Sequence, residues 1–224
     1  MIVYSWAGLC NRLRVLFSYH FLNKNEKMVI IWENNRACPG LFLDYFEPIK
    51  NVDFLNEPVE NIDVKANGQH KKTRKDFIYE ELKLKNYLKE KINQKIEELG
   101  NYVAVHIRRT DTISTPWKKE SYVSDEDYIK FINDHPDHNV YIATDNYETQ
   151  KKFYDLFKDK VKVINFIEKP KKYIPAVRQT SLEDTIIDIY MCIGADHFMG
   201  SGYSSMTTLI EQIRDHNQKT QNLC

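Results

Sequence analysis

The sequence has no excess charge of either sign, because its 32 lysine and arginine residues balance 32 aspartate and glutamate residues. A protein that binds nucleic acid or a membrane surface through its overall field carries a clear positive excess. The balanced charge therefore argues against that mode of binding. Any site for an anionic ligand must be local, built from a few basic side chains or backbone amides.

Metal-binding and disulfide patterns are also missing. The four cysteines, Cys10, Cys38, Cys192 and Cys224, form no Cys-x-x-Cys pair, and the seven histidines are scattered without metal-ligand spacing. No Asp-x-Asp follows an apolar strand. We therefore expect reduced thiols, as in a cytoplasmic protein, and no metal site.

Long hydrophobic runs are absent as well. No stretch approaches the roughly 18 apolar residues of a membrane span, and strand-like sequence starts at Met1 without the charged and apolar regions of a signal peptide. We expect a soluble cytoplasmic protein without a membrane span. Its 224 residues, 42% of them hydrophobic, suffice for one large or two small folded domains.

The most informative predicted strand starts at Tyr102 and leads to Asp111. Apolar residues occupy both of its alternating faces, as in a sheet covered on both sides, and charge appears only at its carboxyl end. A period of two puts His106 and Arg108 on one face and Arg109 on the other. A guanidinium at this edge of an α/β sheet can bind phosphate or carboxylate through two parallel bonds. The alternative is a pair of surface arginines in salt bridges.

A strand, a glycine turn and a helix open the chain. Residues 1–6 are β-prone, Gly8 permits a tight turn, and apolar residues recur with helical spacing over residues 9–23. Asn11 and Arg12 fall in the first helical turn, where free backbone amides and the helix dipole favour an anion. The alternative is a glycine turn with a structural role alone.

The rest of the first half contains two more strands and two helices. We predict strands over 29–32 and 52–55, a short helix over 41–46, and a long helix over 78–99 that Gly100 ends as C-cap. Residues 56–77 lack apolar periodicity and carry a solvated basic cluster, Lys71, Lys72, Arg74 and Lys75, so we expect a surface loop there. We place the domain boundary at Gly100, which gives an N-terminal α/β domain of residues 1–100 and a C-terminal Rossmann-like domain of residues 101–224.

Strands alternate with helices through the second half. The predicted strands cover residues 102–108, 139–145, 160–164 and 197–199. Capping boxes, Ser124 with Asp127 and Ser181 with Asp184, mark two of the helix starts. This alternation predicts a parallel, doubly wound sheet, so the expected fold is α/β, with two Rossmann-like domains and a cleft between them.

Three of the predicted strand ends carry polar residues at the same edge of the sheet, over residues 106–111, 144–146 and 200–205. The last of these leads Ser204 and Ser205 into a helix N-terminus, where serines bind a phosphate or act only as N-caps. Asp145 either accepts two N–H donors from a guanine edge or caps the helix that follows. Together the three ends predict a nucleoside diphosphate at the switch point of the sheet.

Four motifs occur in order along the chain: Gly8-Leu-Cys-Asn11-Arg12-Leu, His106-Ile-Arg108-Arg109-Thr-Asp111, Ala143-Thr-Asp145-Asn146 and Gly200-Ser-Gly-Tyr-Ser204-Ser205. They resemble the motifs of the α1,2-, α1,6- and protein O-fucosyltransferase superfamily, and the second is most similar to the α1,6 enzymes. The resemblance implies a GT-B fold. It also implies an inverting, metal-independent transfer of fucose from GDP-fucose to a glycan or other acceptor hydroxyl.

The resemblance also implies roles for individual residues. Arg108 would hold the donor β-phosphate and act in catalysis, and His106 and Asp145 would contact the guanosine. Ser204 and Ser205 would line the phosphates. Asn11, with Arg12 beside it, would face the cleft from the first domain.

Two positions depart from the α1,6 pattern. Pro116 stands where a glutamate proposed as catalytic base is expected, and Thr112 stands where a lysine is expected. The carboxylates nearest that motif are Asp111, Glu120 and Asp125. Asp111 is the candidate base, although the neighbouring arginines compete for its carboxylate.

The size of the first domain and the lack of a transmembrane stem also differ from Golgi relatives and fit a soluble bacterial or viral enzyme. Two other functions remain open. One is a non-catalytic module that binds a GDP-sugar or a glycan, which the missing glutamate favours. The other is a glycosyltransferase that uses a different nucleotide sugar in the same cleft.

Overall fold

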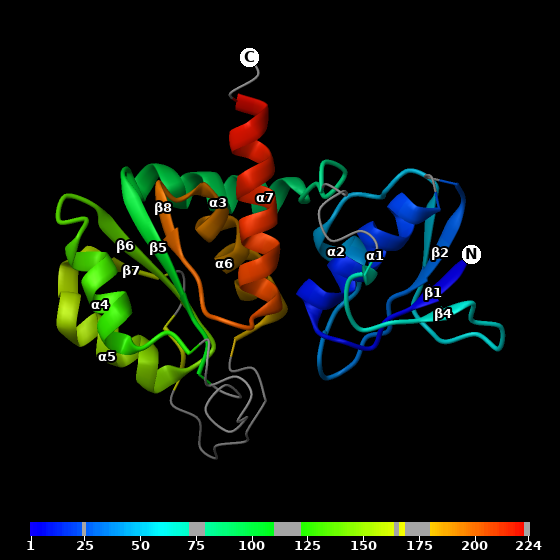
Figure 1. Ribbon diagram of the computed structural model, residues 1–224, viewed down its shortest axis with the longest axis horizontal. Coiled ribbons are helices and arrows are strands. Elements are labelled where there is room, and N and C mark those ends of the chain that lie inside the picture. Colours follow the sequence, from blue (N-terminus) through cyan, green and yellow to red (C-terminus); the bar gives the residue numbers. More distant parts are fainter. Residues whose placement is uncertain (24–25, 72–78, 110–121, 164–165, 169–179, 222–224) are drawn as a thin grey trace. The chain divides into compact units, whose positions relative to one another are not determined.

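The computed structural model describes residues 1–23, 26–71, 79–109, 122–163, 166–168 and 180–221. The chain forms two compact units, one of residues 1–89 with 212–224 and the other of residues 90–211. Each unit contains a parallel sheet of four strands with helices packed on it (Figure 1). The α/β class predicted from the sequence is therefore confirmed.

The N-terminal unit has the strand order β3-β2-β1-β4. Its elements are β1 (Ile2–Tyr4), α1 (Leu9–Leu22), β2 (Met28–Ile31), α2 (Phe42–Tyr45), β3 (Val52–Leu55) and β4 (Val64–Lys65). Strand β4 lies within residues 56–77, where we expected only loop, and that expectation is wrong. Val64 pairs with Val3 and Lys65 with Tyr4, so a strand of two residues, too short to show a pattern, completes the sheet.

The C-terminal unit has the strand order β7-β6-β5-β8. Its elements are α3 (Asn86–Leu99), which begins in the N-terminal unit, β5 (Tyr102–Ile107), α4 (Asp125–Asn133), β6 (Asn139–Thr144), α5 (Tyr147–Phe157), a 3₁₀ turn (Lys158–Lys160), β7 (Val161–Lys162), α6 (Leu182–Gly194), β8 (His197–Met199) and α7 (Ser205–Gln221), which ends in the N-terminal unit. The predicted strand and helix order of this half is confirmed, with shifts of a few residues at the ends.

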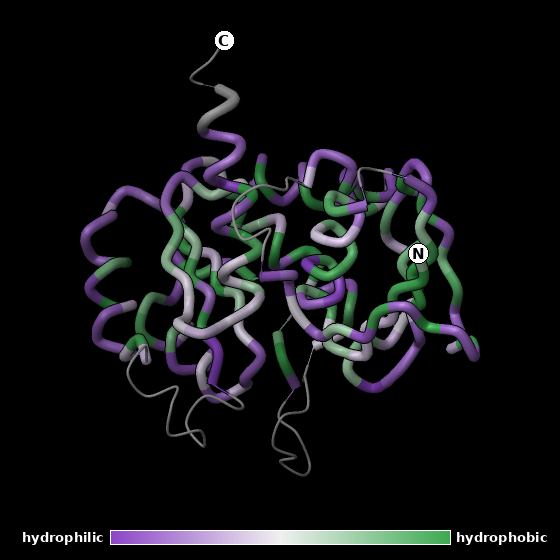
Figure 2. Tube along the Cα trace, turned by 45° about the vertical axis from the view of Figure 1, so that its right-hand side comes forward, coloured by the Kyte–Doolittle hydropathy of each residue, from purple (hydrophilic) through white to green (hydrophobic). Residues whose placement is uncertain are grey.

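The two faces of the C-terminal sheet bury different residues. Val103, Val105 and Ile107 of β5 belong to one core cluster with Tyr128 of α4 and Phe153 of α5. Figure 1 shows α4 and α5 together at this side of the sheet. In Figure 2 the outer helices alternate between hydrophilic and hydrophobic residues, as expected for helices with one face on a core.

The opposite face of this sheet packs on α6 through two tyrosines. The Tyr102 hydroxyl donates to the carbonyl oxygen of Met191 at 2.7 Å, and the Tyr141 hydroxyl donates to Asp188 Oδ1 at 2.7 Å. Both tyrosine side chains are buried, so these bonds satisfy polar atoms that would otherwise lack partners. The sheet is therefore covered on both faces, as the apolar alternation of β5 predicted.

The predicted helix ends are confirmed where the sequence carries a specific cap. The Ser124 hydroxyl accepts from Asp127 N at 3.1 Å, and the Ser181 hydroxyl accepts from Asp184 N at 3.0 Å. Each aspartate carboxylate in turn accepts from the backbone amide of its serine, which completes the two capping boxes. Gly100 follows α3 with φ 61°, a conformation that favours glycine, and its amide donates to Ile96 O at 3.0 Å.

The start of α3 differs from the prediction. We expected a helix from residue 78, which lies outside the described residues, but α3 begins at Asn86. Leu84 forms an antiparallel bridge with Phe46, and Lys85 N donates to Tyr45 O at 2.9 Å. This backbone pairing overrides the helical spacing of the apolar residues before Asn86.

Candidate functional site

The three polar strand ends meet at one edge of the C-terminal sheet. Strand β5 pairs in parallel with both β6 and β8, with His106 opposite Ala143 and Val105 opposite Met199. The carboxyl ends of these strands therefore lie side by side. The structure brings together the residues at 106–109, 144–146 and 200–205, as the sequence predicted.

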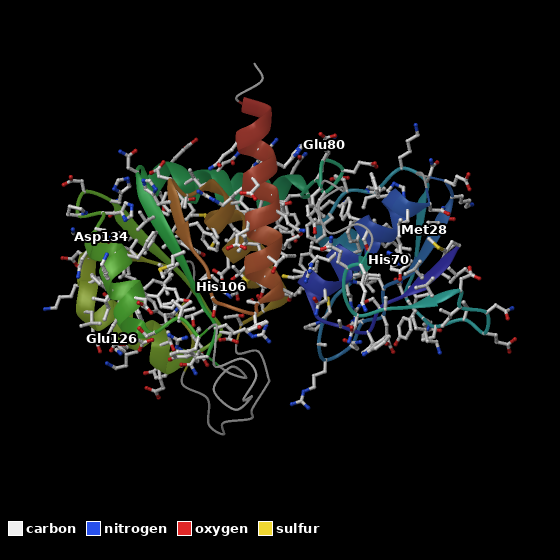
Figure 3. All side chains as sticks on the ribbon, viewed as in Figure 1. Met28, His70, Glu80, His106, Glu126 and Asp134 are labelled. Carbon is white, nitrogen blue, oxygen red and sulfur yellow. The ribbon has the colours of Figure 1, made fainter. Side chains whose placement is uncertain are left out.

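His106 lies at the carboxyl end of β5, beside the first turn of α7 (Figure 3). Its side chain is buried, and its Nδ1 lies 2.9 Å from the Thr207 hydroxyl oxygen. Burial, with a contribution from the positive charge of Arg108, lowers the pKa of His106 to about 3. The imidazole is therefore neutral at physiological pH, and Arg108 is close enough to influence it.

Arg109 is turned to the opposite face, as the alternation of the strand predicted. Its Nη2 donates to Asp125 Oδ1 at 2.6 Å and to Val123 O at 3.0 Å, and its guanidinium lies 4.6 Å from the ring centre of Tyr122. Arg109 therefore pairs with an acidic side chain and a backbone carbonyl behind the sheet. Arg108 is only partly buried, so the two arginines have different environments.

Asp145 does not cap the helix that follows it, so that alternative is wrong. The N-cap of α5 is Asn146, whose side chain accepts from Thr149 N at 2.8 Å. Asp145 Oδ1 instead accepts from Arg109 N at 3.2 Å. The carboxylate thus ties the end of β6 to the end of β5, next to Arg108.

The serine turn leads into α7 with a buried hydroxyl. Ser204 directly precedes Ser205, the first residue of the helix, and its side chain is 2% exposed. Among the residues that the structure describes, Ser204 Oγ has no hydrogen-bond partner. Tyr203 has φ 50°, which is unusual for a residue other than glycine. A buried hydroxyl without a partner at a helix N-terminus can bind a ligand oxygen.

Asn11 and Arg12 lie in the first turn of α1, in the N-terminal unit. Arg12 is fully buried, and its Nε and Nη1 each donate at 2.6 Å, to the carbonyl oxygens of Ala7 and Glu33. Burial lowers the pKa of its guanidinium. These bonds hold the turn before α1 in place, and Asn11 is partly buried beside it.

The candidate bases are only partly described. Asp111 and Glu120 lie outside the described residues, as do Thr112 and Pro116. Asp125 is described, and both its oxygens are engaged, one by Arg109 and one by Lys152 at 2.6 Å. Burial alone would raise the pKa of Asp125, but these two hydrogen-bonded cations outweigh burial and lower it. Asp125 is therefore poorly suited to accept a proton.

A model of the GDP-fucose protein O-fucosyltransferase family matches residues 7–217. The chain belongs to this family. Membership makes it a fucosyltransferase-like glycosyltransferase, and the superfamily resemblance seen in the four motifs is confirmed.

Solved fucosyltransferase structures share the fold of this O-fucosyltransferase family member. The α-1,6-fucosyltransferase NodZ soaked with GDP-fucose matches with a TM-score of 0.62 and 13% identity, over 95% of this chain and 92% of that chain. NodZ from Bradyrhizobium matches with a TM-score of 0.60 and 14% identity, over 94% and 92%. POFUT1 in complex with GDP-fucose matches with a TM-score of 0.62 and 11% identity, over 96% and 93%. These enzymes have the GT-B fold, so the expected fold class is confirmed.

A pocket of about 220 Å³ lies beside the carboxyl end of β6. Thr144 of β6, Gln150 of α5 and Phe166 contribute to its lining, together with acidic residues of α6. Gln150 is held in place because its Oε1 accepts from Ile167 N at 2.7 Å. Asp145 directly follows the lining residue Thr144 in the chain.

Sequence reasoning missed two buried residues of the candidate site. Thr207 contacts His106, and the Tyr128 hydroxyl donates to His106 O at 3.0 Å and to Gly200 O at 3.2 Å. Burial raises the pKa of Tyr128 to about 12, so the hydroxyl remains a donor. A core-facing tyrosine and a threonine in an amphipathic helix carry no motif. The only signal was the glycine turn, because close packing at Gly200 implies a neighbour.

In the described part of the chain, no group of three or more histidine, cysteine, aspartate or glutamate side chains is arranged to hold a metal ion. None of the helices found there is both long and apolar enough to cross a bilayer.

Proposed function

We propose that this chain transfers fucose from GDP-fucose to an acceptor hydroxyl, with inversion at the anomeric carbon and without a metal ion. The observation that carries the proposal is the buried Ser204 hydroxyl, which has no partner among the described residues and lies at the N-terminus of α7. An oxygen of a donor phosphate would supply that partner. Membership of the O-fucosyltransferase family supplies the substrate class.

The proposed donor lies along the carboxyl edge of β6, β5 and β8. Ser204, Ser205 and the first amides of α7 bind its phosphates, and Arg108 holds the β-phosphate through two parallel N–H bonds. His106 and Asp145 contact the guanosine. In this orientation the guanine enters the pocket that Thr144 lines, one residue before Asp145 in the chain.

Charge on the leaving group explains why Arg108 is assigned a catalytic role. As the bond between the anomeric carbon and the phosphate oxygen breaks, the β-phosphate of GDP gains negative charge. Arg108 and the amides at the α7 N-terminus oppose that charge, and both are in place before the reaction begins. In this proposal they supply the stabilisation that a divalent cation supplies in metal-dependent glycosyltransferases.

Inversion requires a base on the side of the sugar opposite GDP. The base removes the proton of the acceptor hydroxyl, and the acceptor oxygen bonds to the anomeric carbon while GDP departs with the bonding electron pair. We assign this role to Asp111, which belongs to the motif itself, and not to Asp125, which is held by Arg109 and Lys152 with a lowered pKa. A carboxylate with two cationic partners is a weak proton acceptor.

The N-terminal unit contributes Asn11 and Arg12 to the proposal. Arg12 already donates to Ala7 O in the turn before α1 and to Glu33 O after β2, so its proposed role is to keep Asn11 in position. The acceptor, a glycan or other hydroxyl compound, is assigned to this unit. The scattered cysteines, which form no Cys-x-x-Cys pair, support a cytoplasmic location.

A thermal-shift panel with GDP, GDP-fucose, UDP and ADP tests the donor class. A ligand at 100 times its dissociation constant adds about 2.7 kcal/mol to the free energy of unfolding. GDP and GDP-fucose should raise the melting temperature, and UDP and ADP should not. Stabilisation by UDP or ADP alone would favour a different nucleotide sugar. Stabilisation by GDP-fucose with no release of fucose, to water or to any acceptor tested, would favour a non-catalytic binding module.

A further inference from the structure

Thr207 lies between His106 and the backbone of the serine turn. Its hydroxyl oxygen is 2.9 Å from His106 Nδ1 and accepts from Ser201 N at 3.0 Å. His106, Ser201 and Thr207 are each at least 92% buried, since their exposed fractions are 5%, 2% and 7%. The hydroxyl thus links the end of β5 to the serine turn and is shielded from bulk solvent.

Among the described residues, the hydrogen of the Thr207 hydroxyl has one possible acceptor, His106 Nδ1. The Ser201 amide can only donate, so it occupies one lone pair of Thr207 Oγ1. If His106 Nδ1 carried a proton and also donated, the Thr207 hydroxyl hydrogen would be buried with no acceptor in the described part of the chain. If Nδ1 is unprotonated, it accepts that hydrogen, and the Thr207 hydroxyl and Nδ1 are both satisfied.

We propose that Thr207 is a positioning residue that fixes neutral His106 as the tautomer with its proton on Nε2, so that this nitrogen donates to an acceptor atom of the bound nucleoside diphosphate. The proposal rests on the proposed function for the identity of the ligand. An Nε2 lone pair would repel a ribose, guanine or phosphate oxygen, whereas an Nε2–H attracts it. None of the described residues forms a hydrogen bond with Nε2, so the donor remains available to a ligand.

Packing around Thr207 holds this arrangement rigidly. A Cβ added at Gly200 would lie 2.2 Å from Thr207 Cγ2 and 2.8 Å from its hydroxyl oxygen, so only glycine leaves room for the side chain. Tyr128 donates to the carbonyl oxygens of both His106 and Gly200 and ties the strand end to the turn. The hydroxyl of Thr207 is therefore held in place beside His106 Nδ1.

Nitrogen-15 NMR of the ligand-free protein tests the tautomer directly. The two ring nitrogens of His106, assigned by their loss in His106→Gln, should have the separate shifts of an Nε2-protonated ring. Thr207→Ser should keep them, because the hydroxyl remains. Thr207→Val should move the shifts toward a mixture of tautomers, whereas Thr208→Val should not, because that hydroxyl donates to Ser204 O at 3.1 Å. A parent ring protonated on Nδ1 would overturn the proposal, even if Thr207→Val failed to fold.

Calorimetry with GDP adds a readout of function. Thr207→Val should lower the affinity for GDP at least 10-fold and raise the KM for GDP-fucose while kcat changes little. Thr207→Ser should restore most of the GDP affinity and most of the parent KM. Unchanged GDP affinity in a folded Thr207→Val would contradict the positioning role. If the parent binds no GDP, the proposed function fails, and the NMR result still decides the tautomer.

Discussion

Arg108 and Arg109 are neighbours in the chain, but the structure gives them different partners. Arg108 is assigned to the donor phosphate, so Arg108→Lys, which keeps the charge but loses the planar fork, should slow transfer about 100-fold. Its melting temperature should stay within a few degrees of the parent value. Kinetics with GDP-fucose and melting curves measure both effects.

Arg109→Lys is the matched control, because it makes the same substitution on the opposite face. Arg109 bonds Asp125 and Val123 behind the sheet. Its replacement should therefore lower the free energy of unfolding by a few kcal/mol and leave the activity of the folded fraction close to that of the parent. If Arg108→Lys kept most of the turnover while Arg109→Lys lost it, the assignment of the two faces would be wrong.

Asp145→Asn separates base recognition from structure. The asparagine oxygen can still accept from Arg109 N, so the melting temperature should change little. The amide cannot accept two N–H donors from a guanine edge, so GDP should bind at least 10-fold more weakly and selectivity over ADP should fall. Asn146→Ala is the control, because losing this cap lowers stability by about 1 kcal/mol without touching the base. Equal GDP affinity in parent and Asp145→Asn would contradict base recognition by Asp145.

His106 should make stability depend on pH, because its pKa in the folded protein is about 3 and an unfolded histidine has a pKa of about 6.5. Between these values the unfolded state binds a proton that the folded state does not. The free energy of unfolding should therefore fall as the pH falls, by about 2 kcal/mol from this group between pH 6.5 and 4.5. Urea unfolding at the two pH values should show a smaller loss for His106→Gln. An equal loss in both proteins would mean that His106 titrates normally.

At the scale of elements, the glycine turn before α7 is predicted to be intolerant of any side chain. In Gly200→Ala the new Cβ would meet Thr207 Cγ2 at 2.2 Å, so the turn or the helix start must move. We expect a loss of roughly 1–3 kcal/mol in the free energy of unfolding and weaker GDP binding. Gly68→Ala is the control, because a Cβ there would have no atom within 4 Å. Equal unfolding curves for Gly200→Ala and the parent would show that the contact relaxes freely.

The helices and strands show what sequence patterns can and cannot predict. Capping boxes at Ser124 and Ser181 and the C-cap at Gly100 were predictable because each is made by residues close together in the chain. Strand β4 and the late start of α3 were not, because both depend on backbone pairing with distant segments, β1 for Val64 and residue Phe46 for Leu84.

The candidate site likewise has features that the local sequence predicts and features that depend on contacts between distant residues. The opposite faces of His106 and Arg109 followed from strand alternation, and the meeting of three strand ends followed from the parallel sheet. The role of Asn146 as the α5 cap in place of Asp145 depends on which side chain reaches Thr149 N, and two adjacent residues with similar side chains do not reveal that. Thr207 was not predictable because its contact with His106 spans 101 residues.

At the scale of the whole molecule, the described donor-binding candidates divide between the two compact units. His106, Arg108, Asp145, Ser204 and Ser205 belong to residues 90–211, whereas Asn11 and Arg12 belong to the N-terminal unit. The protein as a whole has no net charge. Binding of an anionic nucleotide therefore has to come from local groups such as Arg108 and the α7 N-terminus, as the sequence analysis required.

Transfer of fucose from GDP-fucose in the presence of excess EDTA tests whether Arg108 and the α7 amides replace a metal ion. The protein should release GDP and fucosylate an acceptor hydroxyl at the same rate with and without the chelator, because Arg108 and the α7 amides provide the charge stabilisation. The linkage formed should have the configuration opposite to that in the donor. Abolition of transfer by EDTA, with recovery on adding manganese, would show that the transfer depends on a metal ion.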